Sequence, residues 1–242
     1  TTTIGLGNSA LGTLNLTNAE LDTIQDGFAS ITIGHASGSG AMDVRGYTFK
    51  DNLILRTPIG NGDIVLNGAL ATGSGSQAGT ITLQAGRSIL GNTGASVTTQ
   101  GGDIVFNADR DESNGGNIQL VGTDVVSNGG DIVLGGGANP LTTAAVGIGT
   151  GSAAAGAGVY LTGSTLTSGL GEISLRGVGV DGASSAFGVD ISGASKLSST
   201  SGGITLHGTG GISTVDGTSS NHGIQVTANS DLSSDVGGVW LT

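Results

Sequence analysis

The chain is patterned by a short unit in which apolar and polar positions alternate. The unit reads Gly-x-Ile/Val-x-Leu/Phe, as in segments 62–66, 102–106 and 130–134. Successive side chains of a β-strand point to opposite faces, so residues two apart share a face. The pattern predicts short strands with one buried apolar face and one solvated polar face. The apolar pairs are Ile64 and Leu66, Ile104 and Phe106, Ile118 and Leu120, Ile132 and Leu134, and Ile173 and Leu175.

The unit recurs along the chain at intervals of 14 to 27 residues. Between the strong units lie weaker strand-like segments that end in Asn-Gly, Ser-Gly or Gly-Gly, where glycine supplies the positive φ of a sharp corner. Three short strands with glycine corners would close one triangular coil. The weaker segments are 123–130, 164–171, 195–203 and 230–238.

These features predict an all-β fold, a right-handed parallel β-helix whose strands stack about 4.8 Å apart around a narrow apolar core. At roughly 20 to 23 residues per coil, the region after Asn61 would form about eight coils. The alignment of the units stays open, because a spacing of 14 to 16 residues fits either two faces of one coil or one short coil. A β-sandwich is disfavoured because it prefers antiparallel hairpins and a more aromatic core.

The first sixty residues differ from the rest. Thr17 and Glu20 have the spacing of a capping box, with Leu16 and Leu21 as the accompanying hydrophobic pair. They predict one short helix at about 18–26, followed by a strand with Ile31 and Ile33 inward; the alternative is a polar turn. We therefore divide one continuous solenoid into atypical first coils, 1–60, and a repetitive shaft, 61–242.

Composition narrows the class further. The 242 residues include 49 Gly but only 2 Pro, which excludes collagen, and no Cys, which excludes disulfides and thiolate metal sites. The net charge of −11 argues against nucleic acid and anionic membranes as partners. No apolar run reaches the length of a membrane-spanning helix, and the missing initiator Met and signal segment suggest an excised or processed piece.

Several segments in order along the chain, among them "LTNAELDTI", "GDIVLNGAL", "AGTITLQAGRSIL", "GGDIVFNADRD" and "GGITLHGTGG", resemble large exoproteins of the filamentous haemagglutinin type. The resemblance implies a secreted bacterial surface fibre with a β-helical shaft, exported through an outer-membrane pore by two-partner secretion. The expected role is a non-catalytic structural or adhesive segment, extracellular at the bacterial cell surface.

The resemblance also implies the partners: copies of the chain or adjoining coils, the secretion pore during export, and host or surface glycans. The family offers no catalytic residues to transfer. Its secretion domain carries an Asn-Pro-Asn-Gly/Leu type of motif, whereas here Asn139-Pro140 is followed by Leu141. The chain therefore looks like shaft.

Two alternatives place a binding or active site on loops. Asp109, Asp111 and Glu112, with Arg110 between them, form the densest acidic cluster and predict a solvated loop that could bind a surface ligand. A carbohydrate site would lie on loops such as 108–114 or 135–158. Sugar hydrolysis needs paired carboxylates, but the Asp-Asp pair and Gly-His-Gly of pectin enzymes are absent, so an enzyme is not expected. The glycine-rich segments lack the lysine of a phosphate loop.

Calcium is the one metal that the sequence suggests. Asp63, Asp103, Asn117 and Asp131 occupy the same place in the unit, so stacking could align their oxygens. The calcium-binding nonapeptide is absent, however, and Asp or Asn after a glycine corner is an ordinary turn former. The histidines 35, 207 and 222 have no metal-ligand spacing. No cofactor is therefore expected.

Overall fold

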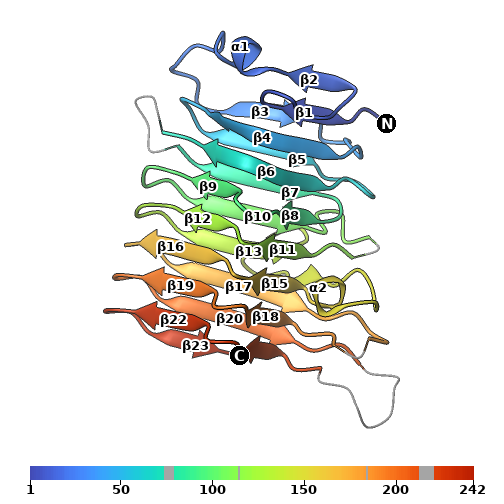
Figure 1. Ribbon diagram of the computed structural model, residues 1–242, viewed down its shortest axis with the longest axis vertical. Helices are drawn as coiled ribbons and strands as arrows, with labels where there is room; N and C mark the ends of the chain where they lie inside the picture. The colour runs from blue at the N-terminus through green and yellow to red at the C-terminus, as the bar shows by residue number, and fades with distance from the viewer. Residues whose placement is uncertain (74–78, 114, 184, 213–220) are drawn as a thin grey trace.

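A computed structural model of the chain describes residues 1–73, 79–113, 115–183, 185–212 and 221–242. These residues form an all-β fold of two parallel sheets, which confirms the predicted fold class (Figure 1). The helices among them are two single turns, α1 (Asn18–Leu21) and α2 (Ala153–Gly156). None of these helices is long and apolar enough to cross a membrane.

The first sheet, sheet A, has 14 strands and the second, sheet B, has nine. The strands of sheet A are β1 (Ile4–Leu6), β2 (Leu14–Leu16), β4 (Met42–Thr48), β6 (Ile64–Ala71), β8 (Ile89–Gly91), β9 (Ser96–Thr98), β11 (Ile118–Val121), β12 (Asp124–Val126), β15 (Val159–Thr162), β16 (Thr165–Gly169), β18 (Val189–Ser192), β19 (Lys196–Ser199), β21 (Ile224–Val226) and β22 (Asp231–Ser234). The strands of sheet B are β3 (Ile31–Gly34), β5 (Leu53–Thr57), β7 (Ile81–Ala85), β10 (Ile104–Ala108), β13 (Ile132–Gly136), β14 (Ala145–Val146), β17 (Ile173–Val178), β20 (Ile204–Thr209) and β23 (Val239–Leu241).

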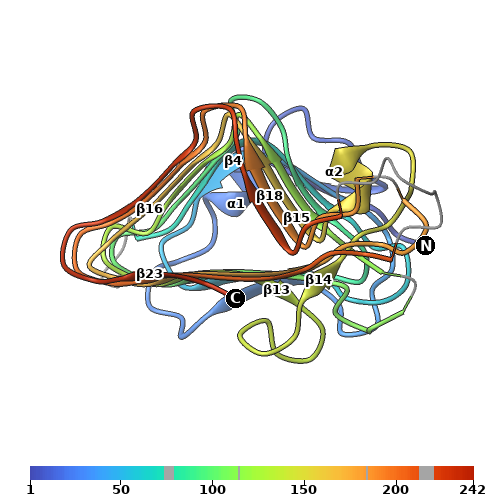
Figure 2. The same cartoon turned by 90° about the horizontal axis from the view of Figure 1, so that it is seen from below.

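The chain passes through three strand positions in turn and then repeats, and we call one such circuit a coil. The long strand β6 pairs with β8 through Ile64 and with β9 through Ala69, so sheet A bends around a corner and provides two of the three positions. Sheet B provides the third. Seen from below, the stacked coils have a triangular outline (Figure 2). The weaker segments of the sequence are strands β12, β16, β19 and β22, which occupy the second position of sheet A.

Strand register settles the 14-residue spacing. Ile104 pairs with Ile132 in sheet B, whereas Ile118, halfway between them, pairs with Ile89 and Val159 in sheet A. Consecutive strong units therefore alternate between two faces of one coil. Ile104 and Ile132 lie 28 residues apart in the chain, more than the 20 to 23 predicted per coil. The prediction of about eight coils after Asn61 is accordingly wrong, because sheet B has six successive strands there, from β7 to β23.

The core consists of the predicted alternating residues. Ile104, Phe106, Ile132 and Leu134 are all fully buried, and partners in register stack directly on one another. Val133 was predicted to face solvent but is only 6% exposed. The insertion after β13 explains the difference, because its residues 139–141 line a hollow together with Val133 and so fold back over the outer face of the strand.

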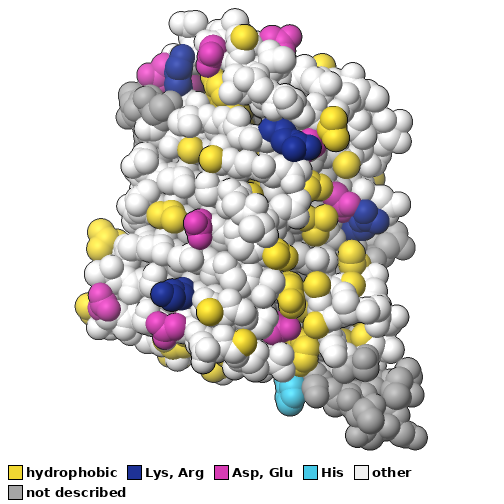
Figure 3. Space-filling model, viewed as in Figure 1, with side chains coloured by type: hydrophobic (Ala, Val, Ile, Leu, Met, Phe, Trp, Pro, Cys, Tyr) yellow, Lys and Arg dark blue, Asp and Glu magenta, His cyan; other side chains and the backbone are white. Residues whose placement is uncertain are grey.

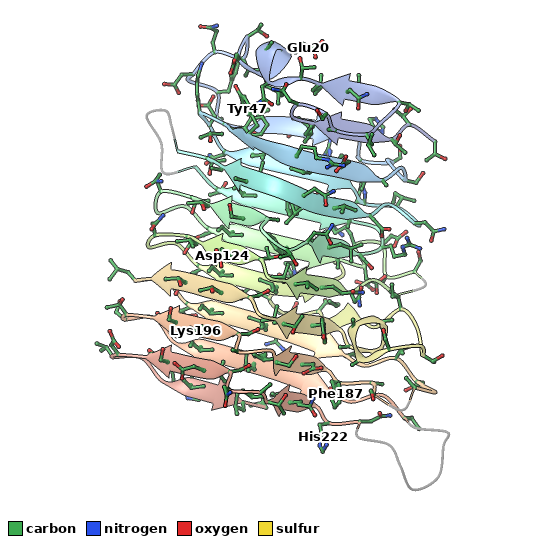
Figure 4. The ribbon with its side chains drawn as sticks, viewed as in Figure 1. Glu20, Tyr47, Asp124, Phe187, Lys196 and His222 are labelled. Carbon is green, nitrogen blue, oxygen red and sulfur yellow. The ribbon has the colours of Figure 1, made fainter. Side chains whose placement is uncertain are left out.

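The helix α1 covers the N-terminal end of the stack. The capping box is present: the Thr17 side chain accepts the N–H of Glu20, and the Glu20 carboxylate accepts the N–H of Thr17 at 2.8 Å. The helix ends at Leu21, earlier than the predicted 26, because the chain continues in turns that bond three residues back. Leu21 is 2% exposed, and nearby Tyr47, with its ring edge-on to Phe49, donates to Asp22 at 2.8 Å (Figure 4).

The opposite end of the stack is open. Val239, Trp240 and Leu241 of β23 are 41%, 54% and 54% exposed, although their register partners Ile204 and Leu206 in the preceding coil are fully buried. The same alternating sequence is thus buried where another coil covers it and exposed where none does.

Candidate functional site

Coil length varies mainly at one corner, where the chain leaves sheet B for the first position of sheet A. We call these connections the variable corner: segments 58–63, 86–88, 109–117, 137–158, 179–188 and 210–223, of which 114, 184 and 213–220 lie outside the described residues. The variable corner includes α2 and lies on the right of Figure 1. Because loops at this corner can grow without disturbing the strands, it is the natural place for a binding site.

The corner between the second position of sheet A and sheet B is nearly constant. We call segments 99–103, 127–131, 168–172 and 199–203 the constant corner. Each begins with Thr or Ser and has Gly in fourth place. A Cβ on Gly130 would lie 2.4 Å from the carbonyl of Gly102, and one on Gly171 would lie 2.0 Å from that of Gly130. The glycines are therefore stacked backbone on backbone, where no side chain fits.

The leading hydroxyls of the constant corner are fully buried and bonded. Thr99 donates to the carbonyls of Gly102 and Ser127, and Ser127 donates to those of Gly130 and Ser168. Each hydroxyl thus joins its own turn to the next coil. Because buried polar groups are stable only when paired, this corner is a structural device and offers a ligand no free group.

The acidic segment of the sequence analysis lies at the variable corner. Asp109 was predicted to lie on a solvated loop, but it is only 5% exposed, and its backbone has φ +48°, a left-handed conformation. Asp111 accepts the N–H of Gly60 at 2.7 Å, and Glu112 accepts the N–H of Ala138 at 3.0 Å. The prediction of a loop standing away from the body is therefore wrong: carboxylates of this loop bond the loops of neighbouring coils.

Asp109 has an unusual titration. Burial, together with the nearby carboxylates of Asp111 and Glu112, raises the pKa of Asp109 to about 6, although a backbone hydrogen bond from Ser113 opposes this. Its Oδ1 atom is buried without a hydrogen-bond partner. Asp109 therefore carries a charge near neutral pH in a place that disfavours it.

The three aspartates proposed for calcium do not come together. Asp103 and Asp131 are stacked before β10 and β13 in sheet B, whereas Asp63 stands before β6 in sheet A. Asp103 accepts the N–H of Asp131 at 2.9 Å, and Asp131 accepts that of Glu172 at 2.8 Å. These carboxylates are thus already bonded to the backbone of the next coil.

Asp63 has a different environment, because it forms an ion pair with Arg87 and accepts the N–H of Ser88 at 2.9 Å. Asn117, its counterpart two coils on, is fully buried and donates to the carbonyls of Ala154 and Ala157. Within the described part of the chain, no three His, Asp or Glu side chains are arranged to hold a metal ion.

The histidines are also separate. His35 bonds Ser37, His207 bonds Thr242, and His222 stacks on Phe187 with ring centroids 6.0 Å apart (Figure 4). Burial and the neighbouring Arg176 lower the pKa of His207. The three histidines therefore have three unrelated local roles.

Charged side chains are sparse on the face shown in Figure 3, where they stand singly or in small mixed groups. Figure 4 labels two of them, Asp124 on β12 and Lys196 on β19, which lie in the same outward-facing column of sheet A. This face presents no continuous basic surface.

A polar hollow of about 330 Å³ opens at the variable corner. It was not foreseen from the sequence, because its two arginines, Arg56 at the end of β5 and Arg110 after β10, lie in separate coils. The available signal was that both stand at or just beyond the end of a sheet B strand, where register brings such residues to the same corner. The lining includes Arg56, Pro58, Ile59, Gln84, Arg110 and Asp111.

Comparison with known proteins finds no matching family model, no matching curated protein and no matching solved structure. The geometry of the chain itself is therefore the basis for any assignment of function.

Proposed function

We propose that this chain is a non-catalytic structural segment of a secreted bacterial surface fibre, in which the stacked coils form a right-handed parallel β-helix that acts as a shaft. The observation that carries the proposal is the unbroken stack. Eight strands of sheet B follow one another from β3 to β23, all parallel. The right hand is inferred because crossover connections between parallel strands of one sheet are right-handed in about 98% of cases.

The interior supports a mechanical role. Apolar residues stack in register along the axis, and the hydroxyls and glycines of the constant corner form further columns beside them. Each coil contacts only its neighbours, so such a fold can be extended by adding coils without a new core. After export, each coil would fold on the one before it.

The open end supplies the surface for further assembly. A coil placed against β23 would pair its free edge and cover Val239 and Leu241, as β23 itself covers Ile204 and Leu206. The partner in this proposal is an adjoining coil of a longer fibre or a second copy of the chain. Sedimentation velocity over a range of concentrations separates the two, because only stacking of copies gives species that grow with concentration.

Surface labelling tests the location. Antibodies raised against the purified chain should label intact cells of the source bacterium, in extended structures that protrude from the cell. A cytoplasmic protein of the same cells provides the control for intactness. Labelling that appears only after the cells are permeabilised would contradict the proposal.

A further inference from the structure

The hollow at the variable corner combines features that the shaft does not use. It lies between β5 and β7 of sheet B and the loops 58–63 and 109–113 of two different coils. The chain has only seven Lys and Arg residues against 18 Asp and Glu, yet two arginines line this one hollow. Positive charge is therefore concentrated here in an otherwise acidic molecule.

Neither guanidinium is committed elsewhere. In the described residues, the ion pairs are those of Arg45 with Asp43 and Arg87 with Asp63, and the Arg56 and Arg110 side chains form no hydrogen bond. The Nε atom of Arg56 is buried without a partner. Because a buried unpaired N–H is costly, a ligand that accepts from it gains a hydrogen bond the protein alone does not make.

More polar groups without partners lie close by. Arg56 pairs in register with Gln84, and Gln84 with Asn107, so these three residues stack in adjacent coils. Of the four buried side-chain atoms that lack a partner in the described residues, three belong to Arg56, Asn107 and Asp109. The unmet hydrogen-bonding capacity of the molecule is thus gathered around this corner.

Asp111 determines which anion fits. Its carboxylate lines the hollow, but its two oxygens accept the N–H groups of Gly60 at 2.7 Å and Ser113 at 3.3 Å, so it is held in place. It would repel a purely anionic ligand such as phosphate and would accept from hydroxyl donors. A ligand with a carboxylate for the arginines and hydroxyls for Asp111 and Gln84 satisfies both requirements.

The remaining lining is apolar. Pro58 and Ile59 border the hollow, and Ile59 is 42% exposed, so it offers a surface for the C–H face of a sugar ring. The volume of about 330 Å³ is at the small end of the range for ligand pockets, about 300 to 1,000 Å³. This size suits a single sugar unit rather than an oligosaccharide.

We propose that this hollow binds a hexuronate, the acidic sugar unit of polysaccharides, with Arg56 and Arg110 on its carboxylate and with Asp111 and Gln84 on its hydroxyls. Neutral sugars lack the group that pairs with the arginines, and simple carboxylates lack the hydroxyls. The site goes beyond the shaft role and does not depend on it, since a chain that never assembles would still contain it.

Calorimetric titration of the full chain tests the proposal with three probes: D-glucuronate, D-glucose and acetate. Glucuronate should bind at least about tenfold more tightly than either of the others. Arg56→Gln and Arg110→Gln should each weaken glucuronate binding about tenfold or more. Arg110→Lys should also weaken it, because an ammonium group lacks the planar two-pronged geometry that matches a carboxylate.

The control variant is Arg176→Gln, because Arg176 stands in the same outward column of sheet B but lines a different hollow. It should bind glucuronate like the unaltered chain, and thermal unfolding should show that each variant is folded. Absence of glucuronate binding, binding that the arginine variants leave unchanged, or equal binding of acetate and glucuronate would each overturn the proposal.

Discussion

The two corners that flank sheet B follow opposite rules. At the constant corner every described turn repeats the same order of hydroxyl and glycine, and carbonyls of one coil lie within 3 Å of any Cβ that the next coil could carry there. At the variable corner the connection ranges from segment 86–88 to segment 137–158, and it includes α2. One corner fixes the spacing of the stack, and the other is free to differ from coil to coil.

The difference shows how a repetitive fold can acquire local function. Longer surface loops add little entropic cost, since loop closure depends only weakly on length. A single tight corner is therefore enough to keep the coils in register while loops on the opposite side diverge. The hollow with Arg56 and Arg110 is at the divergent corner, and the buried hydroxyls of Thr99 and Ser127 are at the constant one.

The sharpest test of this contrast places one substitution at both corners. Gly130→Ala should lower the free energy of unfolding by about 3 kcal/mol or more, because its Cβ would meet the backbone of Gly102 at 2.4 Å. Gly151→Ala, in the variable corner, should change it by less than about 0.5 kcal/mol, since nothing lies within 4 Å of the new methyl group. Urea unfolding measures both, and equal effects would erase the contrast.

The second test concerns the charge stored at the variable corner. The pKa of Asp109 in the folded chain is about 6, above its ordinary value of 3.8, so the folded state holds its proton more tightly. The contribution of Asp109 to stability is therefore most favourable below pH 4 and is lost as the pH rises through 6. Asp109→Asn should raise the free energy of unfolding at pH 7.5 by about 1 to 3 kcal/mol.

Asparagine is chosen because it tolerates the left-handed backbone that Asp109 adopts. The same variant should flatten the dependence of stability on pH between 4 and 6.5. Asp124→Asn, on an exposed strand position, serves as the control and should leave that profile unchanged. A profile that Asp109→Asn leaves unaltered would mean that the buried carboxylate is not the group that titrates there.

The smallest expected effect comes from the hydroxyls. Thr99→Val keeps the shape of the side chain but leaves the carbonyls of Gly102 and Ser127 without its hydrogen bonds. It should cost about 1 to 2 kcal/mol of unfolding free energy. Thr142→Val should cost much less, because the Thr142 hydroxyl is exposed and bonds only the nearby carbonyl of Asn139. Thermal unfolding of the pair suffices, with similar losses contradicting the structural role of the constant corner.

Much of the framework could be predicted from the sequence because it depends on local patterns. Period-two alternation identified core residues such as Ile104 and Phe106, and the Thr17–Glu20 spacing identified the helix. The coil length could not be predicted, because two faces carry the same unit and only pairing in space separates Ile118 from Ile104 and Ile132. Weak units such as that of β19 were correctly assigned to short strands because glycine corners bound them.

The site could not be predicted in the same way. The burial of Asp109 depends on loops from neighbouring coils that its own segment does not specify. Arg56 and Arg110 meet only because two intervening circuits of the chain bring them to one corner. The calcium hypothesis treated Asp63, Asp103 and Asp131 as one column, but register places them in two. The secretion and adhesion roles stay proposals.

Native-state hydrogen exchange is the most direct test of the central claim that one corner holds the stack and the other is free. Amides of the constant corner, such as Gly101 and Ser127, bond carbonyls of the next coil and should exchange only through global unfolding. Amides of segment 148–152 should exchange far faster through local opening. Equal protection at the two corners, or faster exchange at the constant one, would contradict the claim.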